Sequence, residues 1–168
     1  MKINQERLEA LAAEWLPVTE IAEYHRMQKP HYRMGDWPNW HLVEFLAHEM
    51  GHWLGLGESL SEPPGGKKDI SSELAKRSDQ FCDFNELRAT VVTMRVGAEV
   101  NAPTRFIQKA EQSVYGNIGS WFTFDDDEPP ELAGKKEEAA LRRMLGSRRT
   151  KRMAKKVIEE LQRQGVLQ

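Results

Sequence analysis

The feature that most restricts how this chain can fold is an apolar run that also carries two histidines and a glutamate. The segment "LAHEMGHWLGLGES" starts at Leu46, places His48 and Glu49 side by side, and has His52 four residues after the first histidine. Apolar residues surround them over a wide arc, which is typical of a helix buried on nearly all sides. Burying ionisable groups without partners is costly, so this helix needs a partner for them, such as a metal ion.

The spacing of the two histidines favours such an ion. On a helix, His48 and His52 lie one turn apart on the same face, so their ring nitrogens can converge on one cation. Two such histidines with a glutamate after the first form the zinc-hydrolase pattern H-E-x-x-H. Glu49 would then act as general base on a water whose pKa the Zn²⁺ lowers to about 7. The alternative is that the motif is a chance match and that both rings are hydrogen-bonded in the core. A third histidine, His41, lies about 10 Å along the helix axis from His48 and is too far away to bind the same ion.

Two resemblances accompany this motif. "HEMGHWLGLGE" resembles the zinc motif of metzincins, matrixins in particular, where the third ligand is a histidine at the position of Glu58. "HEMGHWLG" together with "FNELRATVVTMRVGAE" resembles the metallopeptidase domain of ArdC-type antirestriction proteins and the ImmA/IrrE peptidases. This second resemblance spans roughly residues 40–100 and implies a bacterial zincin metallopeptidase that cleaves a protein or peptide substrate. It also implies that Zn²⁺ is bound by His48, His52 and Glu86.

The residues themselves leave the third ligand open. Small residues flank Glu86 on its helix and would allow that helix to approach the motif helix closely, which favours Glu86 over Glu58. However, the helix dipole alone also favours an acidic residue in the first turn of a helix, so Glu86 could occupy such a position without binding a metal. Further candidates are Asp79, Asp83 and the acidic run 125–128.

The end of the chain is basic. Residues 1–130 carry a net charge of −8 and residues 131–168 one of +6, although the whole chain is at −2. Between residues 139 and 158 there are eight Lys or Arg and no acid, including Arg148, Arg149, Lys151 and Arg152, which could contact phosphates. This suggests a second hypothesis, a nucleic-acid-associated accessory protein with a structural or vestigial zinc site. The plainer interpretation is a solvated amphipathic helix pair packed on the domain.

Helical periodicity predicts a mostly α protein (α+β), with at most a small sheet near residues 32–34, before the motif helix. We expect a metallopeptidase domain over 1–130 and a basic helical extension over 131–168. Asn4 and Asn39 are the expected caps of the first helix and the motif helix, which should end near Gly55 or Gly57. Further helices are expected over residues 18–27, 135–145 and 150–164. Another helix is expected to end near Asn101, and the next one to begin at Pro103. With one cysteine, no signal peptide and no membrane span, a cytoplasmic protein is expected.

Overall fold

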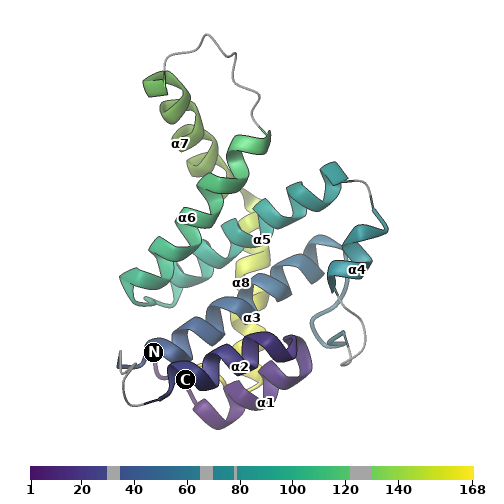
Figure 1. The fold of residues 1–168 in the computed structure, drawn as a ribbon, viewed down its shortest axis with the longest axis vertical. Helices are drawn as coiled ribbons and strands as arrows, with labels where there is room; N and C mark the ends of the chain where they lie inside the picture. The colour runs from purple at the N-terminus through teal and green to yellow at the C-terminus, as the bar shows by residue number, and fades with distance from the viewer. Residues whose placement is uncertain (30–34, 65–69, 78, 122–129) are drawn as a thin grey trace.

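The computed structural model describes the chain except residues 30–34, 65–69, 78 and 122–129, and it leaves out the side chains of residues 71, 79–83, 114–121 and 130–134. Within the described residues the chain is helical and has no strand, which confirms the mostly α prediction. In the part of the chain that the structure describes, no helix is both long enough and apolar enough to cross a membrane. The helices are α1 Gln5–Trp15, α2 Val18–Met27, α3 Trp37–Gly55, α4 Ile70–Ala75, α5 Asp79–Glu99, α6 Thr104–Trp121, α7 Pro130–Gly146 and α8 Arg148–Arg163 (Figure 1).

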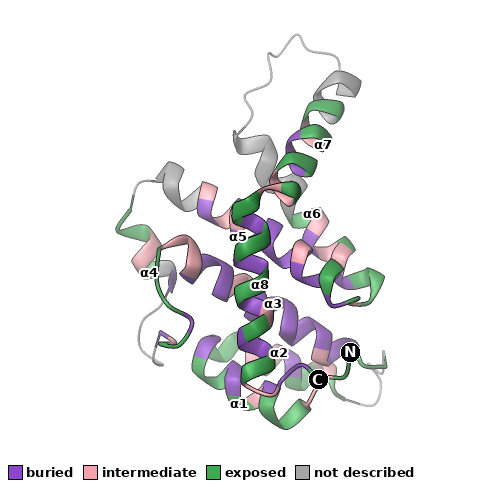
Figure 2. Ribbon diagram, turned by 180° about the vertical axis from the view of Figure 1, so that it is seen from behind, coloured by how far each residue is buried: buried purple, intermediate pink, exposed green. Residues whose placement is uncertain are grey.

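The motif helix α3 lies near the middle of the molecule. Helices α1 and α2 pack on one side of it and α5 on the other, with α6 against α5 (Figure 1). Helix α8 crosses both α3 and α5, and seen from behind its buried and exposed residues alternate along the helix, so that one side of it is buried (Figure 2). Its buried residues Met153, Val157 and Leu161 belong to the same apolar core as Leu8 and Leu46. The last helix is therefore part of the main core, and a domain boundary at residue 130 stays a prediction.

The two ends of the chain meet beside this core. Ile3 and Leu167 form an isolated antiparallel bridge, and the Lys2 amide donates to the carbonyl of Gln168 at 2.9 Å. The predicted cap of the first helix is confirmed, because Asn4 Oδ1 accepts from the Arg7 amide at 3.2 Å. These contacts hold α1 and the C-terminal helix together.

The predicted start of the motif helix was wrong. Helix α3 begins at Trp37, before Asn39, because Pro38 in the first turn has no N–H that would need an intrahelical acceptor. Asn39 instead donates to Asp36 Oδ1 at 2.7 Å and accepts from the Tyr24 hydroxyl at 2.9 Å, which ties α3 to α2. The short strand expected at residues 32–34 lies outside the described residues.

Helices α3 and α5 approach each other closely because two glycines of α3 face small or polar groups of α5. A Cβ on Gly51 would lie 3.1 Å from the Cα atom of Ala89, and one on Gly55 would overlap Asn85 Oδ1. The Asn85 amide donates to the His52 carbonyl at 3.3 Å, which fixes the start of α5 against the end of α3. This close contact brings residue 86 to the two histidines.

Candidate metal centre

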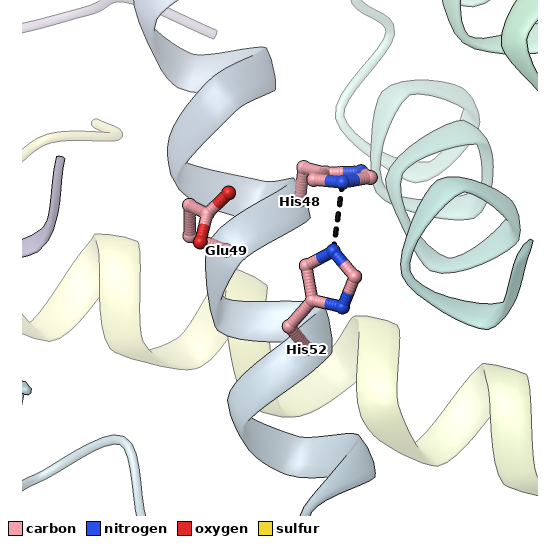
Figure 3. Close-up of side chains that lie close together, drawn as sticks. All are labelled: His48, Glu49 and His52. Carbon is pink, nitrogen blue, oxygen red and sulfur yellow. Dashed lines mark hydrogen bonds between the residues drawn. The ribbon is translucent and has the colours of Figure 1, made fainter. Parts of the chain in front are cut away.

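His48 and His52 leave α3 on the same side, as the one-turn spacing predicts (Figure 3). Their Nε2 atoms are 3.0 Å apart, and the two ring planes are nearly perpendicular, at 88°. The His52 side chain is 2% exposed and that of His48 is 22% exposed. The pair is therefore buried on the His52 side and reached by solvent on the His48 side.

Glu86 comes to this pair from α5. Its Oε1 lies 2.9 Å from His48 Nε2 and its Oε2 lies 2.7 Å from His52 Nε2, so one carboxylate spans both rings. The Glu86 side chain is 42% exposed, which places it at the rim of the site. The structure thus brings together His48, His52 and Glu86, three residues that the sequence suggested as ligands.

These contacts shift the pKa values of Glu86 and His48. Burial raises the pKa of Glu86, but the hydrogen bonds and positive charges of His48 and His52 lower it by more, to well below its ordinary value. Burial lowers the pKa of His48, but the hydrogen bond and charge of Glu86 raise it overall. In this structure, contacts with the two imidazoles stabilise the charged form of Glu86. A cation between the three groups would take over that role.

The arrangement fits a zinc ion. Two neutral imidazoles and one carboxylate form a known ligand set of catalytic zinc sites, which keep a fourth position for water or substrate. Tetrahedral bonds of about 2.0–2.1 Å separate the ligand atoms by about 3.3 Å. The three contacts here, at 3.0, 2.9 and 2.7 Å, are slightly shorter, so a small opening of the cluster would admit the ion.

Glu49 lies beside this cluster and leaves α3 in a different direction from the two rings (Figure 3). The ligand atoms of His48, Glu49 and His52 nevertheless all lie within 4.8 Å of one another. Burial raises the pKa of Glu49, while the charges of His48 and His52 lower it in part. Glu49 is therefore close to the two imidazoles, but it makes none of the short contacts that join His48, His52 and Glu86.

The other candidate ligands lie elsewhere or are not described. Glu58 is exposed beyond the end of α3, in a pocket of about 540 Å³ that Lys156 and Arg163 also line. The structure does not bring it to the imidazole pair. The side chains of Asp79 and Asp83, and the run 125–128, lie outside the described residues.

Sequence reasoning missed a second polar cluster on α3. His41 and Glu44 are both buried, and Lys109 of α6 donates to both, at 3.0 Å to His41 Nδ1 and at 2.7 Å to Glu44 Oε2. The available signal was Glu44 itself, a charged residue in an otherwise apolar helix and three residues after a histidine. Its partner on α6, 65 residues further on, could not be read from local spacing.

The basic residues of α8 lie on its solvent side. Arg148, Arg149, Lys151 and Arg152 are exposed, and in the described part of the chain no ion pair involves them. Burial and the positive charge of Arg149 lower the pKa of Arg88 to about 10, so the basic surface extends onto α5.

Comparison with known proteins gives no match, whether with protein-family models, curated proteins or solved structures. The residues and their geometry are therefore the basis for assigning a function.

Proposed function

We propose that this protein is a zinc-dependent metallopeptidase. The observation that carries the proposal is the convergence of His48 and His52 from one helix with Glu86 from another, with all contacts between them at 3.0 Å or less. The ligand types are those of zinc hydrolases, and Glu49 stands at the position of the general base in H-E-x-x-H. The zincin resemblance of the two segments agrees with this assignment.

Each residue has a distinct role in the proposed reaction. His48, His52 and Glu86 would hold the ion, which when bound polarises the substrate carbonyl and makes a water ligand acidic near neutral pH. Glu49 would accept a proton from the attacking water as its oxygen bonds to the carbonyl carbon. It would then deliver that proton to the amine nitrogen as the C–N bond breaks. The exposed side of His48 and Glu86 is where a peptide would reach the cluster.

The test combines metal analysis with hydrolysis of a mixed peptide library. Wild-type protein should bind one zinc per chain, and Glu49→Gln should keep the zinc while losing about 100-fold or more of the hydrolysis rate. Glu58→Gln, the same change at the alternative glutamate, should alter neither the zinc content nor the hydrolysis rate. Wild-type protein purified without chelators and found free of stoichiometric zinc would contradict the proposal.

A second candidate function rests on the exposed cations of α8. Four such residues without ion pairs in the described structure could contact nucleic-acid phosphates, with or without a catalytic role for the zinc site. Reversing two of them, with Arg148→Glu and Arg149→Glu, should weaken DNA or RNA binding and flatten its salt dependence. Reversing two exposed cations of the α2 region, with Arg26→Glu and Lys29→Glu, is the matched control. If wild-type protein fails to bind at low salt, this function is excluded.

A further inference from the structure

Helix α8 has an exposed face that carries only positive charge over the segment 148–156. Every exposed residue of this segment is a lysine or an arginine, and the first acidic residue after it is Glu159. These residues form the cationic face of α8 and are Arg148, Arg149, Lys151, Arg152, Lys155 and Lys156. Among the described residues this face makes one ion pair, from Lys155 to Glu159 at 3.6 Å, and both side chains are exposed. Exposed pairs contribute little, so the positive charge of the face is available to a ligand.

The fold places this face on the surface and next to further positive charge. Helix α8 packs across α5 and α3, and Figure 2 shows it at the front of the molecule with those two helices behind it. Burial and then the positive charge of Arg149 lower the pKa of Arg88 on α5 to about 10. Positive charges held together repel each other, and a polyanion that binds to them removes the repulsion. The surface is therefore suited to a partner with closely spaced negative charges.

The cations lie on both sides of the exposed ridge of α8. With about 100° between successive residues, Arg149 and Lys156 lie about 40–60° to one side of Arg152 around the helix axis. Lys151 and Lys155 lie about 60–100° to the other side. The cationic face extends over about 12 Å of helix. It therefore offers positive charge to two separate rows of anions, one along each side of the helix.

A membrane surface does not fit the cationic face. Basic amphipathic helices bind membranes by burying their apolar side at the boundary between headgroups and acyl chains. The apolar side of α8 already lies in the protein core, where Met153, Val157 and Leu161 are buried. The side that α8 exposes is the charged one, which has no apolar residues to insert.

A protein partner and a single nucleic-acid strand also fit this face less well. Protein interfaces are anchored by a few large side chains that fill pockets of the partner, and the cationic face has no apolar or aromatic member. Single strands are bound by stacking their bases on aromatic rings. The Phe84 ring of neighbouring α5 is covered on one side by the Arg88 guanidinium, 4.3 Å from the ring centroid. The phosphates of a duplex require neither apolar anchors nor stacking.

From the chemistry and arrangement of these residues, we infer that the cationic face of α8 binds in the major groove of double-stranded DNA. This groove is about 12 Å wide and admits an α-helix, with the phosphates of one strand along each edge. Arg149 and Lys156 would contact one strand, and Lys151 and Lys155 the other. The major groove of A-form RNA is too deep and narrow for side chains, so B-form DNA is the duplex that fits. This inference rests on the nucleic-acid function proposed for α8 and does not involve the metal centre.

The experiment measures binding of the full chain to a labelled DNA duplex of mixed sequence, by fluorescence anisotropy at a series of salt concentrations. The comparison ligands are one of the two DNA strands alone and the RNA duplex of the same sequence, and phosphatidylserine vesicles serve as competitor. The DNA duplex should bind about tenfold more tightly than either comparison ligand, with a log–log salt slope of about −5 for six phosphate contacts. Equal or tighter binding of the RNA duplex, or displacement of the DNA by vesicles at equal phosphate concentration, would overturn the inference.

Paired neutral variants test whether both strands are contacted. Arg149→Gln with Lys156→Gln removes the cations from one side of α8, and Lys151→Gln with Lys155→Gln removes them from the other. All four positions are exposed, so the fold should tolerate the changes. Each pair should reduce the magnitude of the salt slope by about 2. If only one of the two pairs changes the slope, a single strand of the duplex is contacted, which contradicts binding in the groove.

Two controls separate this inference from the proposed functions. Arg26→Gln with Lys29→Gln removes two exposed cations of the α2 region and should keep the wild-type slope. A zinc chelator should leave DNA binding unchanged, whether or not the protein is a metallopeptidase. Binding of the single strand as tightly as the duplex would refute the groove site and leave the nucleic-acid function standing. No binding of any of the nucleic acids at low salt would exclude both.

Discussion

The Cα atom of Ala89 lies 3.1 Å from the position that a Cβ would take on Gly51. Gly51 stands between the two histidines of α3, and Ala89 is one helical turn after Glu86. The absence of a side chain at this crossing is therefore what allows the carboxylate of one helix to reach the imidazoles of the other.

The first prediction follows from this contact. In Gly51→Ala the added methyl group meets the backbone of α5, which has to move away by a few tenths of an ångström. We expect zinc affinity to fall about tenfold, because Glu86 moves with the backbone while His48 and His52 stay. Competition with a zinc chelator measures the change. Gly146→Ala, where nothing lies within 4 Å of the new methyl, is the control and should leave the affinity unchanged.

The second prediction separates the two glutamates that the sequence offered as third ligand. Glu86→Gln should weaken zinc binding at least about 100-fold, which is about 2.7 kcal/mol, whereas Glu58→Gln should leave it unchanged. A ligand that binds only the folded state raises the melting temperature, so zinc should stabilise the wild type and Glu58→Gln far more than Glu86→Gln. Thermal unfolding with and without added zinc gives the comparison. If Glu58→Gln is the variant that loses the stabilisation, Glu86 is not the ligand.

Local patterns predicted much of this fold but could not predict how the helices cross. The cap at Asn4 and the helix at 18–27 are set by residues close in sequence, and both are confirmed. The cap at Asn39 was wrong because a contact with Tyr24 of another helix, rather than a helix end, determines the role of its side chain. Tertiary partners of this kind leave no local signature.

In the candidate site, too, local helix geometry could be predicted from the sequence, whereas contacts between helices could not. The one-turn spacing of His48 and His52 already implied converging rings, since helix geometry is regular. The position of Glu86 depends instead on the α3–α5 contact through Gly51, and small residues only hint at such a contact. The pairing of His41 with Lys109 joins residues 68 positions apart and gave no signal on the α6 side.

The third prediction concerns the start of α8. Ser147 Oγ accepts from the Thr150 amide at 3.1 Å and so satisfies one of the free N–H groups at the helix N-terminus. Ser147→Ala should lower the free energy of unfolding by about 1 kcal/mol, as measured by urea denaturation. Ser113→Ala, at an exposed position within α6, is the matched change and should cost less than about 0.5 kcal/mol. Equal losses for the two variants would mean that the cap does not stabilise α8.

The last prediction concerns the ion pair between Lys109 and Glu44. Lys109 Nζ lies 2.7 Å from Glu44 Oε2, with the two side chains 35% and 10% exposed. Lys109→Met keeps most of the apolar stem but removes the ammonium, which lies 4.5 Å from the centroid of the Phe45 ring, and so leaves the Glu44 charge without its cation. We expect a loss of about 2 kcal/mol in the free energy of unfolding at pH 7, less than for a fully buried pair because Lys109 is partly solvated.

The pH dependence of this loss identifies its cause. Burial raises the pKa of Glu44, but His41 and Lys109 lower it overall, so its contribution in the wild type is present above its ordinary pKa and is lost as the pH falls. In Lys109→Met burial is less opposed and raises the pKa, so the variant is penalised at neutral pH and relieved when Glu44 takes up a proton. The difference between the two proteins should therefore shrink toward zero below about pH 4, in urea titrations at a series of pH values. The exposed Lys135→Met should show no such trend. A difference that stays constant with pH would mean that lost packing, and not the Glu44 charge, destabilises the variant.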